Sequence, residues 1–169
     1  MVAHPQIIDI QIASRIAGIP AKRSFRKWLL AALPKSAELT LRAVNAAEAR
    51  NLNSAFRGKD YATNVLTFVY HEKKSPVLMG DIVLCAPIVA REARAQGKSL
   101  VAHYAHLTVH GALHLAGMDH ERERDARAME KKEIAILPPS VTRIRTPNPT
   151  LEKRIRQASL PAFFRLVLK

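Results

Sequence analysis

The stretch HLTVHGALHLAGMDH, residues 106–120, decides the fold and the chemistry expected of this chain. It places His110, His114 and His120 at the spacing His-x3-His-x5-His. Residues four apart lie on the same face of an α-helix, one turn or about 5.4 Å apart, so two imidazoles can share one metal ion. Gly117 favours a helix end at which the chain turns back and brings His120 in as a third ligand. We therefore predict a catalytic zinc site with an open coordination position, one Zn²⁺ per chain.

Two histidines at this spacing also arise by chance in a segment rich in histidine, and this segment also holds His103 and His106. A third histidine behind a glycine, on an otherwise apolar helix, favours metal binding over that interpretation. The spacing is that of the long zinc-protease motif HExxHxxGxxH, in which the glutamate is the general base. Gly111 stands at that position here, which argues against peptide hydrolysis by that mechanism.

Residues 110–120, HGALHLAGMDH, resemble the signature of the YbeY (UPF0054) family of bacterial metal-dependent endoribonucleases, which reads close to HGxLHLxGYDH. Met118 replaces the usual tyrosine at a position that is not a ligand. A second stretch, residues 52–68, LNSAFRGKDYATNVLTF, resembles the family block LNxxYRxxDxPTDVLSF, with Asn64 in place of the usual aspartate. The resemblance covers about residues 38–137 with recognisable motifs, and earlier residues only by pattern.

In the resembling family the arginine of the second block lies in the active-site cleft, which implies a catalytic role for Arg57. A guanidinium suits that role, because it can hold a phosphodiester through two hydrogen bonds and neutralise charge on its oxygens. The alternative is a surface pair between Arg57 and Asp60, which by itself would contribute little. We also predict that Lys59 and Asn53, in the same block, bind substrate.

Two aspartates have two interpretations each. Asp81, in a third family block, Gly80-Asp81-Ile82, is either the partner that orients a ligand histidine through its other ring nitrogen or a turn cap. Asp119, next to His120, has the same two interpretations.

The resemblance implies a zinc-dependent, single-strand-specific endoribonuclease that acts in ribosomal RNA maturation, at the end of the small-subunit RNA, and in ribosome quality control. A zinc-bound hydroxide would attack the RNA phosphodiester while Arg57 binds the phosphate. The base stays open between this hydroxide, Asp81 and the 2′-hydroxyl of the RNA. Two alternatives are a non-catalytic ribosome-assembly factor with a structural metal and a metallohydrolase of another substrate.

The amino-acid composition limits the kinds of partner that we expect for this chain. The chain has 169 residues and a net charge of +13, and so basic a domain favours RNA as its partner. Its one cysteine, Cys85, lies in an apolar run and predicts a core residue with no disulfide partner. Neither a signal peptide nor an apolar stretch of about 18–20 residues is apparent, so we expect a cytoplasmic protein that does not enter a membrane.

Periodicity predicts an α/β (α+β) fold: a single domain with a mixed four-stranded sheet packed with helices, and the metal-binding histidines on a central helix and the following turn. The expected strands are 6–12, 38–44, 63–70 and a central strand at 81–86. The expected helices are 20–33, 46–56, 87–96, 100–116 and 121–136, and the last should turn Ala126, Met129, Ile134 and Leu137 inward.

A composition change divides the chain into a metallohydrolase domain, residues 1–137, and a basic, proline-rich extension, residues 138–169. The extension carries seven Lys or Arg residues and one acid, a net charge of +6. Two interpretations of it are equally supported: an arm that contacts RNA or the ribosome, and an arm that packs on the domain or is a disordered basic end.

Overall fold

A mixed four-stranded sheet forms the centre of the molecule. The computed structural model describes residues 6–33, 36–72, 75–118 and 123–137. The strands are β1 (Ile7–Ile12), β2 (Ala37–Val44), β3 (Val65–Val69) and β4 (Leu78–Cys85), in the order β1-β2-β4-β3. β1, β2 and β4 are parallel to one another, and β3 runs antiparallel to β4 at the edge. The predicted sheet is confirmed, and β4 occupies the predicted interior position.

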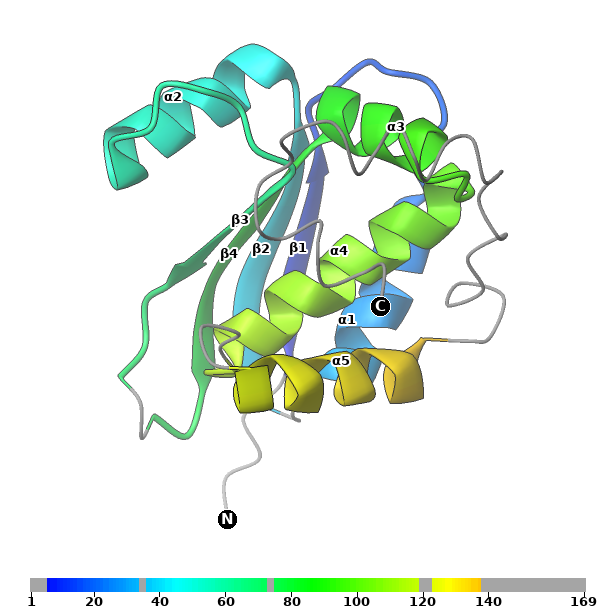
Figure 1. Ribbon diagram of the computed structural model, residues 1–169. Helices are drawn as coiled ribbons and strands as arrows, with labels where there is room; N and C mark the ends of the chain where they lie inside the picture. Colours follow the sequence, from blue (N-terminus) through cyan, green and yellow to red (C-terminus); the bar gives the residue numbers. More distant parts are fainter. Residues whose placement is uncertain (1–5, 34–35, 73–74, 119–122, 138–169) are drawn as a thin grey trace.

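The described residues also form five helices. They are α1 (Lys22–Ala32), α2 (Ala46–Arg57), α3 (Ala86–Ala95), α4 (Leu100–Leu115) and α5 (Glu123–Ile136). Figure 1 shows α4 crossing in front of the sheet, α5 lying low in the view and α2 at the upper left. No helix in the described ranges is long and apolar enough to cross a membrane.

The apolar run of β4 supplies side chains to both faces of the sheet. Ile82 and Leu84 join the core that α1 and α4 cover, whereas Val83 and Cys85 join a second cluster with residues of α2. This alternation follows from the period of two along a strand, and it explains why a strand buried on both faces has an almost continuous apolar sequence. Cys85 is a buried free thiol whose pKa is raised by burial, as expected of a core residue.

A side chain caps the start of α2. The Asn45 side chain accepts a hydrogen bond of 2.9 Å from the Glu48 backbone N–H. The Glu48 carboxylate does not complete a reciprocal bond to the cap but pairs with Arg42 at 2.7 Å. Gly58, with a φ of 66°, ends the helix in the left-handed conformation that glycine adopts readily.

Helix α4 approaches the sheet closely at Gly111. A Cβ atom at this position would lie 2.9 Å from Ile82 Cγ2 and 3.3 Å from Thr67 Oγ1. A glutamate side chain would therefore meet the sheet at this point and would not reach a site on the histidine face of the helix. Another side of α4, which includes Ala105, Val109 and Leu113, forms a cluster with residues of α5.

Helix α5 differs from the prediction in one buried position. Met129 and Leu137 are buried as predicted, whereas Ile134 is 57% exposed. Glu133 takes the buried position with an exposure of 7%. Residues 129, 133 and 137 are spaced by four, so they share one face, and that face is the one turned toward α4.

Candidate metal centre

Four histidines follow one another along one face of α4. The rings of His103 and His106 are stacked with centroids 6.4 Å apart, and those of His106 and His110 are 6.0 Å apart. The rings of His110 and His114 are closer, at 4.6 Å and nearly perpendicular. The residues between them face the sheet or α5, so the spacing of three and four gathers the imidazoles on the remaining face of the helix.

His110 and His114 point their Nε2 atoms at one another across 3.1 Å. Two imidazole nitrogens bound to one tetrahedral zinc ion, with bonds of about 2.0–2.1 Å, lie about 3.3 Å apart. The observed separation therefore fits two ligands of a single ion. His110 is 7% exposed and His114 is half-buried.

Glu133 of α5 fixes the orientation of His110. Its Oε1 lies 2.8 Å from His110 Nδ1, and its Oε2 lies 3.7 Å from His106 Nδ1. With Nδ1–H donating to the carboxylate, the lone pair of His110 is on Nε2, the atom that faces His114. Burial alone would raise the pKa of Glu133, but the hydrogen bond from His110 and the neighbouring His106 hold that pKa below its usual value. A carboxylate behind a ligand histidine is the usual arrangement at metal sites.

The third predicted ligand, His120, and its neighbour Asp119 lie outside the described residues. Within the described parts of the chain, no group of three His, Cys, Asp or Glu side chains is assembled to hold a metal ion. His110 and His114 are thus the part of the predicted site that the described residues include, and His120 stays a prediction.

Of the two interpretations given for Asp81, the one in which it orients a ligand histidine does not agree with its position. It lies on β4 between Gly80 and Ile82, two residues that pack toward α4, so its side chain is on the opposite face of the sheet. There its Oδ2 accepts a 2.8 Å hydrogen bond from the Tyr70 hydroxyl. The carboxylate that contacts His110 belongs to Glu133 instead.

Arg57 is the last residue of α2 and is exposed. The alternative pairing with Asp60 does not occur, because Asp60 makes two 2.7 Å hydrogen bonds to Arg50. That pairing holds the pKa of Asp60 below its usual value. Lys59 lies in the following loop and is also exposed.

Asn53, predicted to bind substrate, is buried with an exposure of 1%. Its side chain donates a 2.8 Å hydrogen bond to the Tyr61 carbonyl, and its backbone carbonyl accepts one of 3.3 Å from Lys59 N–H. This residue therefore holds the loop after α2 in place, and a substrate would not reach it.

A second carboxylate supports the other end of the histidine row. Glu92 of α3 lies 2.8 Å from His103 Nε2 and also accepts hydrogen bonds of 3.1 and 3.3 Å from the Asn64 amide. Asn64 stands where the resembling family usually has aspartate. An aspartate would place a second negative charge against Glu92, whereas the amide donates to it.

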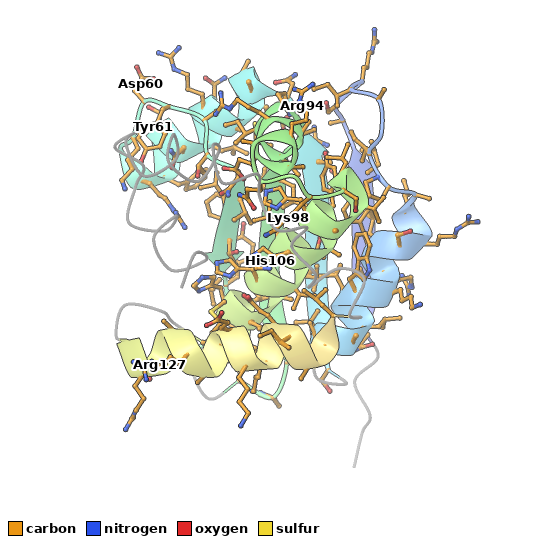
Figure 2. All side chains as sticks on the ribbon, turned by 45° about the vertical axis from the view of Figure 1, so that its right-hand side comes forward. Asp60, Tyr61, Arg94, Lys98, His106 and Arg127 are labelled. Carbon is orange, nitrogen blue, oxygen red and sulfur yellow. The ribbon has the colours of Figure 1, made fainter. Side chains whose placement is uncertain are left out.

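Between these carboxylates lie His106 and Lys98, neither of which was predicted as a site residue. Burial lowers the pKa of His106 to about 4, with Glu133 opposing the shift, so this imidazole is neutral at pH 7. Burial also lowers the pKa of Lys98, although the charges of Glu133 and Glu92 act in the opposite direction. Figure 2 shows Lys98 above His106, with Arg94 higher and Arg127 on α5 lower.

Sequence reasoning missed Glu133 and Glu92 as partners of the histidines. For Glu133 a signal exists, because it falls between Met129 and Leu137 on the apolar face of α5, where a charged residue needs a partner. Glu92 lacks a comparable signal, because acids occur on the exposed faces of most helices.

Comparisons with known proteins agree with this fold and with the sequence motifs. The family model described as "Endoribonuclease YbeY" matches residues 11–140. A protein of that name from Nitrosomonas europaea is 51% identical over 143 residues, which cover 85% of this chain and 84% of the relative. Another, from Nitrosomonas eutropha, is 53% identical and covers 84% of this chain and 96% of the relative. A solution structure of a Thermotoga maritima protein, with a TM-score of 0.58 and 24% identity, covers 92% of this chain and 97% of its own and supports the fold alone.

Proposed function

The chain belongs to the YbeY endoribonuclease family, and from this premise we propose that it is a zinc-dependent endoribonuclease that cuts single-stranded RNA at the histidine face of α4. The reaction would be hydrolysis of a phosphodiester bond. We further propose that its substrate is ribosomal RNA, with the end of the small-subunit RNA as the point of action and the small subunit as its partner in the cytoplasm.

One observation carries the metal part of this proposal. His110 and His114 face each other through Nε2 atoms at 3.1 Å, and Glu133 sets the tautomer of His110 from the opposite ring nitrogen. These two histidines, with His120 as the expected third ligand, would hold a zinc ion, which would supply Lewis-acid activation of a water molecule. Glu133 keeps the ring of His110 in the orientation that this binding needs.

Arg57 is the residue that we propose binds the phosphodiester. Because Asp60 is paired with Arg50, no carboxylate among the described residues competes for the Arg57 guanidinium. The planar guanidinium can donate two parallel hydrogen bonds to phosphate oxygens and offset the negative charge that grows on them during attack. Lys59, exposed in the next loop, adds positive charge along the path of the strand.

Two features favour RNA over a small substrate. The net charge of +13 would attract a polyanion such as RNA, whereas it would not help to bind a small neutral molecule. Gly111, packed against the sheet, leaves no room for the glutamate that serves zinc proteases as general base. A phosphodiester in RNA carries its own 2′-hydroxyl next to the phosphate. Attack by this group would be a transesterification that leaves a cyclic phosphate, and the test distinguishes it from the proposed hydrolysis by an activated water.

The test is single-turnover cleavage of a short single-stranded RNA by the parent protein and by Arg57→Ala. The variant should keep its metal and melting temperature but lose about two orders of magnitude in rate, because stabilisation of transition-state charge is lost. Arg57→Lys should recover only part of the rate, since an ammonium lacks the planar fork.

The matched control is Arg23→Ala, which removes an exposed arginine from α1 and should leave the rate unchanged. Equal rates for Arg57→Ala and the parent protein would contradict the role of Arg57. Substituting 2′-deoxynucleotides in the same strand distinguishes the nucleophiles, because only attack by the 2′-hydroxyl requires that group.

A further inference from the structure

Lys98 lies in the short connection between α3 and α4, a segment with a fixed backbone. Its N–H donates a 2.9 Å hydrogen bond to the Ala93 carbonyl, and Gly97, with a φ of 63°, donates one of 3.2 Å to the Arg94 carbonyl. On the other side, the Ser99 side chain accepts a 3.1 Å hydrogen bond from Ala102 N–H and caps α4. The turn is therefore held at both ends, and the position from which the Lys98 side chain leaves it is defined.

The Lys98 side chain is half-buried beside the histidine row. It interacts electrostatically with Glu92, Glu133 and His106. These groups belong to α3, α5 and α4, so charges from three elements act on the ammonium. Figure 2 shows Lys98 and His106 one above the other on the side of the molecule that carries the histidines.

Both carboxylates near Lys98 are already committed to other partners. The Glu92 carboxylate lies 2.8 Å from His103 Nε2 and accepts a 3.1 Å hydrogen bond from the Asn64 amide. The Glu133 carboxylate lies 2.8 Å from His110 Nδ1. None of the ion pairs within 4.0 Å that the described residues form includes Lys98. A half-buried ammonium that has lost part of its hydration and lacks a direct counter-ion is suited to accept an anion.

We propose that Lys98 binds a phosphate group of the RNA strand at the histidine face of α4, as a second phosphate-binding residue in addition to Arg57. This inference rests on the proposed function and extends it to a residue outside the predicted site. The ammonium is a point charge with three donors, so it would hold a phosphate without a fixed orientation, whereas the Arg57 guanidinium would orient the one that is cut.

The competing explanation is structural: Lys98 would serve only to balance the negative charges of Glu92 and Glu133. The two explanations make different predictions for Lys98→Met, which keeps the length and the apolar stem but removes the charge. If Lys98 binds phosphate, the loss of one contact makes the slope of log K against log salt shallower by about 0.7 and weakens binding roughly tenfold at low salt. If Lys98 only balances the carboxylates, the melting temperature falls and the salt slope stays the same.

The experiment measures the affinity of the full chain for a short fluorescent single-stranded RNA over a range of salt concentrations, together with the melting temperature. Lys98→Arg should retain the salt slope of the parent protein, because it keeps the charge. Lys22→Met, at the exposed start of α1, is the matched control and should also retain it.

A shallower slope for Lys98→Met alone supports the proposal, and a slope equal to that of Lys22→Met overturns it. The parent protein distinguishes this failure from that of the proposed function. If the parent protein cuts RNA and Lys98→Met leaves the slope of log K against log salt unchanged, only the phosphate-binding role of Lys98 is contradicted. A parent protein that neither binds nor cuts RNA contradicts the endoribonuclease assignment itself.

Discussion

Glu133 and His110 are the pair on which the chemistry of the site depends at the scale of single residues. The carboxylate is 7% exposed and accepts from His110 Nδ1 at 2.8 Å. It thereby determines which ring nitrogen of His110 carries a lone pair for a metal ion. A neutral side chain of the same shape would preserve the hydrogen bond but not the charge that makes the imidazole a stronger ligand.

We predict that Glu133→Gln lowers the affinity for zinc by about 10- to 100-fold while the fold is retained. Competition with a chromophoric chelator measures this affinity directly. Glu130→Gln, an exposed position on the same helix, is the control and should bind zinc like the parent protein. Equal zinc affinities in the two variants would show that Glu133 does not support the metal site.

The sequence predicted the pair His110 and His114 but not their partner Glu133, and the difference has a physical reason. His110 and His114 are neighbours because a helix brings residues four apart together, and that geometry is local. Glu133 reaches His110 from a different helix, 23 residues away along the chain, and this contact depends on how α5 packs on α4. Asp81 was one candidate for that role, but the side of the sheet to which it points becomes known only when the neighbouring Gly80 and Ile82 are seen to face α4.

At the scale of the elements, α4 has three faces with different surroundings. Gly111 lies on the face against the sheet, Val109 on the face against α5, and the histidines occupy the third. This third face is only partly covered, and burial there holds the pKa of His106 at about 4. In the unfolded chain the pKa of this imidazole returns to about 6.5.

This difference predicts a pH dependence of stability. Between pH 6.5 and 4 the unfolded chain binds a proton at His106 that the folded chain does not, so the free energy of unfolding falls as the pH is lowered. The loss is up to about 3 kcal/mol, from about 1.4 kcal/mol for each unit of pKa. Urea unfolding of the metal-free protein at several pH values measures it.

In His106→Gln this part of the pH dependence should disappear, because glutamine does not titrate. His71→Gln, in the connection between β3 and β4, provides the control for loss of a histidine elsewhere. The assignment fails if the stability of His106→Gln falls with pH as steeply as that of the parent protein.

The strands and helices agree closely with those predicted from the sequence. Their first and last residues differ from the prediction where contacts between elements determine them. β3 begins at Val65 and not at residue 63, because the Asn64 side chain accepts from Val65 N–H and donates to Glu92. β4 begins three residues earlier than expected, at Leu78, because it pairs with Ala37 at the start of β2. The propensity and periodicity of one segment carry no information about its contacts with another segment, so they do not predict these ends.

At the scale of the whole molecule, the described part of the chain contains the four-stranded sheet and five helices, and it ends with the buried Leu137. The basic extension, residues 138–169, lies outside the described residues. Its role therefore rests on its sequence, a net charge of +6 with seven basic residues. Composition predicts affinity for a polyanion here but does not predict which surface, RNA or the domain itself, the extension contacts.

Ending the chain after Leu137 tests the two interpretations of the extension. An arm that contacts RNA predicts weaker RNA binding and a shallower salt dependence, by about 0.7 in slope for each lost phosphate contact, with an unchanged melting temperature. A packed arm predicts a lower melting temperature and an unchanged slope. The zinc content should stay the same in both cases, because all three predicted ligands precede residue 138.

The central claim, that this protein cuts RNA with a metal ion held by the histidines of α4, is tested most directly by one paired measurement. Zinc content and cleavage of a defined single-stranded RNA are measured on the same sample before chelation, after it, and after zinc is returned. We expect about one zinc ion per chain, loss of cleavage on chelation and recovery with zinc. His114→Ala should lose both zinc and cleavage, whereas His71→Ala should keep both. Full cleavage by the metal-free protein, or unchanged zinc content in His114→Ala, would contradict this claim.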